Sequence, residues 1–100
     1  RITTPPPAAQ PRSHQEQKAL RNQRAALERT SNRILDRIES LEASRRDLEL
    51  QMSAHETYTD PDRMREAKNK LDRTIAELEE LSAEWDRVSD QLVALGTDPA

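Results

Sequence analysis

A seven-residue repeat of apolar side chains runs along most of this chain. In its first half the repeat is the row Leu20, Leu27, Ile34, Leu41 and Leu48. Apolar residues at this spacing fall on one face of an α-helix, and such a stripe is stable in water only when another helix covers it. The repeat therefore predicts an all-α fold in which long helices pair as a coiled coil.

The first half of the chain has a second row of seam positions that is only partly apolar. This row consists of Gln17, Arg24, Ser31, Ile38, Arg45 and Met52. A charge at a seam position contributes no apolar burial, so replacing Arg24 with Leu is expected to stabilise the pairing. The first helix thus supplies a real but weak stripe.

The second half of the chain has the better stripe. Its two rows are Met64, Leu71, Leu78, Trp85 and Leu92, and Ala67, Thr74, Leu81, Val88 and Leu95. Trp85 replaces the usual aliphatic residue, and we interpret it as filling space opposite a small partner such as Ser31. The alternative is an anchor for a partner protein, since Trp is over-represented at binding hot spots.

Capping signals mark the ends of the two helices. Ser13 and Glu16 have the spacing of a capping box, which predicts a first helix over about residues 13–54. Asp60 followed by Pro61 is a helix start, because the carboxylate can accept free amide hydrogens and Pro suits the first turn. The turn is therefore expected over residues 55–60.

The second helix is expected over about residues 61–95. Gly96 can take the left-handed conformation that ends helices. We expect residues 96–100 to form a disordered tail. Residues 1–12 contain four of the six prolines, so they are expected to form a Pro-rich flexible linker.

Composition supports paired helices over a globular core. Only 33% of the residues are hydrophobic, 35% are charged, and the aromatic residues are one Trp and one Tyr. Aromatic side chains bury the most apolar surface per residue, and a chain of this size without them cannot easily build a compact core. Gly occurs once, which is typical of uninterrupted helices.

Charge predicts that the two helices fold back on each other. Residues 12–37 hold seven basic and three acidic residues, a net charge of +4, while residues 77–90 hold six acidic and one basic residue, a net charge of −5. One continuous helix would leave these segments roughly 60 Å apart, beyond useful attraction. An antiparallel hairpin places them side by side, and Arg29, Arg33 and Arg37 are expected to pair with the acidic segment.

The sequence contains no catalytic, cofactor-binding or metal-binding motif. It has no Cys, and its single Gly cannot form a phosphate-cradling loop of the form G-x-x-x-x-G-K-[ST]. His14 and His55 fall in different elements and have no nucleophile arranged around them. No apolar run approaches the roughly 20 residues of a membrane span. We expect an interaction module without an active site, cofactor, small-molecule substrate or membrane contact.

Basic residues gather around the expected turn. Between Arg63 and Arg73 there are five basic and two acidic residues, and Tyr58 lies close to the turn. Exposed cations can contact phosphates, and an aromatic ring can stack on a nucleobase, although capping the apolar seam is the simpler role for Tyr58. The candidate nucleic-acid-binding residues, which we call the tip cluster, are Arg45, Arg46, Tyr58, Arg63, Arg65, Lys68, Lys70 and Arg73.

Several motifs resemble the C-terminal coiled-coil extension of ABC-F ATPases, which have two nucleotide-binding domains and no membrane domain. The helix opening SHQEQKAL at residues 13–20 is similar to the S-x-x-E-Q-[KR]-x-L start of many members, and RIESLE at 37–42 is similar to their I-x-x-L-E repeat. Tyr58 at the turn and Trp85 late in the second helix also match. The residue before Trp85 is Glu84 where Arg is common, which leaves the subfamily open.

The resemblance implies a module of a cytoplasmic, translation-associated ATPase that binds ATP elsewhere in its chain. It also implies contact with DNA or ribosomal RNA, which we expect to be weak and without sequence preference. The alternative is a coiled coil that dimerises or docks on a partner protein, because polar residues at Arg24, Ser31 and Arg45 leave its own seam poor. In the first case the chain would be a monomer or weak homodimer, in the second a stable dimer.

Overall fold

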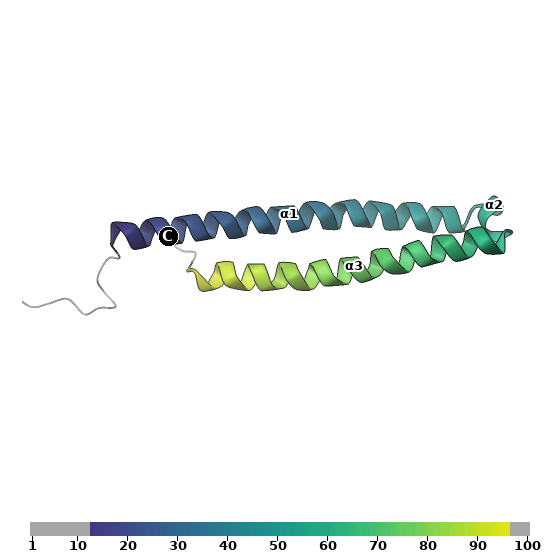
Figure 1. The fold of residues 1–100 in the computed structure, drawn as a ribbon. Coiled ribbons are helices and arrows are strands. Elements are labelled where there is room, and N and C mark those ends of the chain that lie inside the picture. Colours follow the sequence, from purple (N-terminus) through teal and green to yellow (C-terminus); the bar gives the residue numbers. More distant parts are fainter. Residues whose placement is uncertain (1–12, 97–100) are drawn as a thin grey trace, which may run out of the picture.

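The structure is a computed structural model that describes residues 13–96. It contains α1 (His14–Met52), α2 (His55–Tyr58) and α3 (Pro61–Ala94), with no strand among the described residues. The two long helices lie side by side and run in opposite directions, with α2 at the turn (Figure 1). This confirms the all-α antiparallel hairpin. The predicted linker and residues 97–100 of the predicted tail lie outside the described residues.

The beginning of α1 is fixed by the predicted capping box. The Ser13 hydroxyl accepts from the Glu16 amide at 3.1 Å, and the Ser13 amide donates to Glu16 Oε1 at 3.0 Å. Two amide hydrogens that the helix itself cannot satisfy therefore find partners. From this cap α1 continues for 39 residues without interruption.

The connection between the long helices contains a short helix that the sequence did not predict. α1 ends at Met52, and Ala54 adopts an extended backbone that redirects the chain into the four-residue α2. Asp60 then begins α3, its Oδ1 accepting from the Asp62 and Arg63 amides at 3.0 and 3.3 Å. The segment expected as a plain turn is thus a compact, hydrogen-bonded corner.

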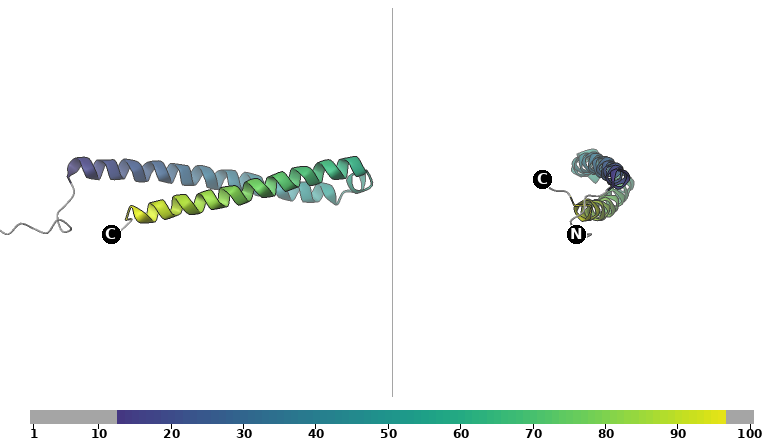
Figure 2. Two further views of the ribbon diagram at one scale, coloured as in Figure 1. Left: turned by 60° about the horizontal axis from the view of Figure 1, so that its bottom comes forward. Right: turned by 90° about the vertical axis from the view of Figure 1, so that its left-hand side faces the viewer.

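The core is a narrow seam between α1 and α3. Its buried residues are Ile34, Leu41, Ala67, Leu78 and Val88. All five stand in the predicted apolar rows, which confirms those rows as the seam. Figure 2 shows the long helices crossing at a shallow angle, as coiled-coil packing requires. Arg45 is exposed and lies 3.9 Å from Glu49 in an ion pair, because its long side chain can leave the seam for solvent.

Arg24 has a role that the sequence analysis missed. Its Nη2 donates to the backbone oxygens of Gly96 at 2.7 Å and of Leu95 at 3.4 Å. These carbonyls lie at the C-terminus of α3, where a cation is favoured by the helix dipole. Gly96 has φ 76°, the left-handed conformation predicted for it. The expectation that Arg24 is merely an unfavourable charge in the seam was therefore wrong.

The opposed charge segments form fewer contacts than the sequence predicted. Arg37 Nε lies 3.0 Å from Glu77 Oε2, which confirms one ion pair across the helices. Arg29 and Arg33 are exposed, and neither makes an ion pair with a residue between 13 and 96. Steps of four residues turn about 40° around a helix each time, so only the last Arg of the three faces α3.

No helix within residues 13–96 is both long enough and apolar enough to cross a membrane.

Candidate nucleic-acid interface

Every side chain of the tip cluster is exposed, and the cluster occupies the part of the hairpin nearest the turn. Its cations lie on the last quarter of α1 and the first half of α3, which the antiparallel fold brings together (Figure 1). Exposure keeps each cation hydrated and available to a partner. The fold does not place them all on one surface, however.

The tip cluster is divided between two sides of the hairpin. Lys70 and Arg73 line a groove on one side, together with Arg37 and Ser44, and we call this the Lys70 groove. Arg45 lines a groove on the other side with Ile38 and Ile75, which we call the Ile75 groove. A partner that lies along one side therefore meets only part of the cluster.

The two grooves also allow the remaining cations of α3 to be assigned to a side. Lys68 is seven residues before Ile75, and Arg65 is two heptads before Glu79, which lines the Ile75 groove. Residues seven apart lie on the same face of a helix, so both belong to the Ile75 side. Arg63, in contrast, lines a small hollow at the turn that also includes Lys70.

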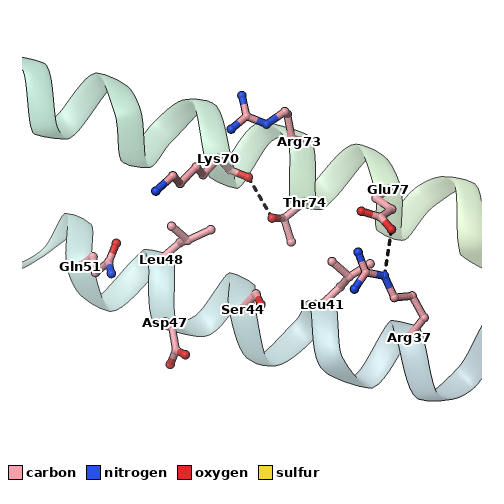
Figure 3. Close-up of a pocket in the computed structure, with 10 residues that line it drawn as sticks. All are labelled: Arg37, Leu41, Ser44, Asp47, Leu48, Gln51, Lys70, Arg73, Thr74 and Glu77. Atoms are coloured by element: carbon pink, nitrogen blue, oxygen red, sulfur yellow. Dashed lines mark hydrogen bonds and ion pairs between the residues drawn. The ribbon is translucent and has the colours of Figure 1, made fainter.

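The Lys70 groove has a volume of ≈ 520 Å³ and an apolar floor that includes Leu41 and Leu48. Figure 3 shows Lys70 extending from α3 into the space between the helices, with Gln51 on the opposite wall. Asp47 points away from this space, while Arg37 and Glu77 pair at the far end of the groove. The ion-pair partner of Lys70 is Glu66, which lies on the same helix with its Oε1 3.7 Å from the Lys70 Nζ.

A second hollow of ≈ 200 Å³ continues the Lys70 groove to the turn. It is lined by Thr57, Arg63 and Glu66 and shares Gln51 and Lys70 with the groove. The shared residues show that the two hollows lie next to each other. Arg63, Lys70 and Arg73 thus follow one side of the hairpin, with about two helical turns between the first pair and one turn between the second.

Local ion pairs hold several of these cations. The distances are 3.6 Å from Arg63 Nε to Asp60 Oδ2, 3.1 Å from Arg65 Nη1 to Asp62 Oδ1, and 3.7 Å from Lys70 Nζ to Glu66 Oε1. Exposed pairs of this kind contribute about 0.2–1 kcal/mol, so a phosphate can displace the carboxylate at little cost. Arg46, Lys68 and Arg73 form no ion pair with any residue in the described part of the chain.

Tyr58 lies in the short helix at the turn. Its side chain is 55% exposed, and its ring forms a T-shaped pair with the ring of His55, the ring centroids being 5.4 Å apart. The exposed part of an aromatic ring is available for stacking. The neighbouring Thr57 lines the hollow at the turn, so Tyr58 stands beside the end of the basic row.

Sequence reasoning overlooked the uncharged walls of the Lys70 groove. Ser44 and Gln51 follow Arg37 at seven-residue steps, and Arg63, Lys70 and Glu77 are related in the same way on α3. These two rows flank the seam on one side and face each other in an antiparallel pair. Extending the heptad map to the flanking rows would have identified the groove.

The described residues include no group of three or more His, Asp or Glu side chains that could hold a metal ion.

A comparison with protein families matches the chain to the ABC transporter C-terminal domain over residues 12–90. No curated protein and no solved structure matches the chain. The family match covers both long helices almost completely.

Proposed function

Since the chain belongs to the ABC transporter C-terminal domain family, we propose that it is the helical hairpin through which an ABC-type ATPase contacts nucleic acid. The match confirms the resemblance to a C-terminal extension of such ATPases. The family is a small helical domain without a catalytic role, so the chain is not itself an enzyme. The proposal goes further and assigns the hairpin a phosphate-binding surface, either on DNA or on ribosomal RNA.

The observation that carries the proposal is the row of three exposed cations along the Lys70 groove. Arg63, Lys70 and Arg73 are exposed on one side of the tip, and the side chain of Lys70 extends from α3 into the groove. A row of cations at helical spacing can follow the phosphates of a nucleic-acid strand without reading its bases. Tyr58 stands near the end of the row, where its exposed ring can stack on an unpaired base.

Binding through this surface is expected to be weak. The chain carries a net charge of −3, and the acidic half of α3 repels a polyanion that extends beyond the tip. Phosphate contacts without base readout give affinities in the non-specific range, with a Kd of about 10⁻⁴ to 10⁻⁶ M. In the parent ATPase the hairpin therefore serves as an additional contact that strengthens a larger interface.

The proposal includes the cellular setting that the ABC-F resemblance implies. ATP is bound by the nucleotide-binding domains of the parent protein, and the hairpin itself takes no cofactor, small-molecule substrate or lipid. A ribosome-associated ATPase acts in the cytoplasm, which is where we place the chain.

Fluorescence anisotropy with labelled duplex DNA, single-stranded DNA and RNA hairpins at low salt tests the proposal. The informative variant is Lys70→Gln with Arg73→Gln. The matched control is Arg29→Gln with Arg33→Gln, which removes the same charge from exposed residues far from the tip. We expect the first variant to lose at least about tenfold in affinity and the control to bind nearly as the parent does. Equal losses in both variants would contradict a surface at the tip.

A further inference from the structure

The acidic half of α3 forms few ion pairs with the rest of the described residues. Its carboxylates at Glu79, Glu80, Glu84, Asp86 and Asp90 make no ion pair with any residue between 13 and 96. In the same helix, residues 63–73 hold five basic and two acidic residues, a net charge of +3, whereas residues 77–90 have a net charge of −5. The helix is therefore strongly basic near the turn and strongly acidic toward its end.

The Ile75 groove exposes apolar surface between these two halves. It has a volume of ≈ 500 Å³, and its lining includes Ile38, Ile75 and Ala83. Leu35 is 43% exposed and stands seven residues before Glu42, which also lines this groove. Residues seven apart share a helix face, so Leu35 extends the apolar patch along the same side. The large aliphatic side chains of Ile38 and Ile75 are only half-buried.

We propose that two copies of this chain associate through the Ile75 groove, antiparallel to each other, with a two-fold axis at Ile75. This arrangement lays the basic half of each α3 along the acidic half of the other. Lys68 is seven residues before Ile75, so it faces position 82 of the second copy, between Glu79 and Asp86. A two-fold interface contains this contact twice, so the attraction between the charges contributes twice to the stability of the dimer.

The same axis pairs opposite charges on α1. Glu42 and Ile75 line the groove together, so they stand at about the same level along the hairpin. Rotation about that level brings Arg45 of one copy opposite Glu39 of the other. The apolar patch around Ile75 is covered at the centre, and the ion pairs surround it, as is usual for protein interfaces.

Two hairpins can also be stacked on this side about a two-fold axis parallel to the helices, which places both turns at the same end. That arrangement lays α3 of one copy along α1 of the other, so Lys68 would no longer face Glu79 and Asp86. Only the antiparallel arrangement brings the basic and acidic halves of the two α3 helices together, and the charge-reversal variants test this contact.

This interface lies on the opposite side from the Lys70 groove. Arg63, Lys70 and Arg73 remain open in the dimer, whereas Arg45, Arg65 and Lys68 are covered. Dimerisation and nucleic-acid contact therefore use different members of the tip cluster, and each proposal can fail without the other.

Sedimentation equilibrium of the whole 100-residue chain tests the proposal through a pair of charge-reversal variants. One variant carries Arg65→Glu and Lys68→Glu, and the other carries Glu79→Lys and Asp86→Lys. The wild-type chain, of 11.5 kDa, is expected to dimerise at low salt and to dissociate as salt is added. Each variant alone should dimerise at least about tenfold more weakly, because the halves of α3 that face each other across the interface then carry charge of the same sign.

An equimolar mixture of the two variants is the decisive sample. In a mixed dimer every reversed cation meets a reversed anion, so the mixture should recover the association that each variant has lost. Circular dichroism of each variant confirms that the helices persist. A wild-type chain that stays monomeric at millimolar concentration would overturn the proposal. A dimer that tightens with salt, or a mixture that fails to recover, would also overturn it.

Discussion

The indole Nε1 of Trp85 donates a hydrogen bond to the hydroxyl of Ser31 at 3.1 Å, joining the last third of α3 to the middle of α1. Both side chains are half-buried. A wide ring on one helix is thus matched by a short hydroxyl side chain on the other. The contact fixes the relative positions of the helices, because a shift by one turn would leave the indole hydrogen without a partner.

Replacing Ser31 with Ala is expected to lower the free energy of unfolding by about 1–2 kcal/mol, because the indole N–H loses its partner in a partly dry site. Trp85→Phe removes the donor and should cost a similar amount through lost contact area. In the double variant the two costs should not add, which thermal or urea unfolding monitored by circular dichroism can measure. Strict additivity would mean that the hydrogen bond contributes nothing.

Arg24 gives a second prediction, opposite to the one suggested by its heptad position. Arg24→Leu removes the bonds to the Leu95 and Gly96 carbonyls, so it should destabilise the chain by about 1 kcal/mol. The Arg24 Nε–H, which is buried without a partner among residues 13–96, limits the loss. Hydrogen exchange should quicken in the last turn of α3 but not near Leu78. A higher melting temperature for Arg24→Leu would show that apolar burial outweighs the cap.

A third prediction compares Arg37, which forms an ion pair across the helices, with Arg33, which forms none with residues 13–96. Arg37→Gln should cost about 0.2–1 kcal/mol at low salt, because the Arg37–Glu77 pair is exposed and screened. Arg33→Gln, which removes the same charge from a side chain without a partner in residues 13–96, should leave stability nearly unchanged. Urea unfolding at two salt concentrations checks both values. Equal effects would indicate a general charge effect with no contribution from the specific pair.

The sequence predicted the hairpin well because every strong signal in it is local and periodic. The apolar rows, the capping box at Ser13 and the Asp60–Pro61 start each depend on residues within one or two helical turns. The register between the two long helices could be predicted because their apolar rows have to face each other. Even the Trp85–Ser31 contact was accessible, since a large residue at a seam position needs a small one opposite.

The candidate site was less accessible because it depends on angles around the helix axes. The tip cluster was identified by proximity in sequence, yet the fold sends Lys70 and Lys68 to opposite sides of the hairpin. The prediction that Arg29 and Arg33 pair with α3 was wrong for the same reason, since each step of four residues turns the side chain further around the helix and away from its neighbour. The role of Arg24 required knowing that α3 ends beside it, a relation that no local pattern contains.

The salt dependence of nucleic-acid binding tests the central claim most directly. Each phosphate contact on duplex DNA contributes about 0.9 to the slope of log K against log salt concentration. For Lys70→Gln with Arg73→Gln we expect the slope to fall by about 1.8 relative to the parent, while Arg29→Gln with Arg33→Gln leaves it unchanged. An unchanged slope in the first variant, or the same fall in both, would contradict phosphate contact through the Lys70 groove.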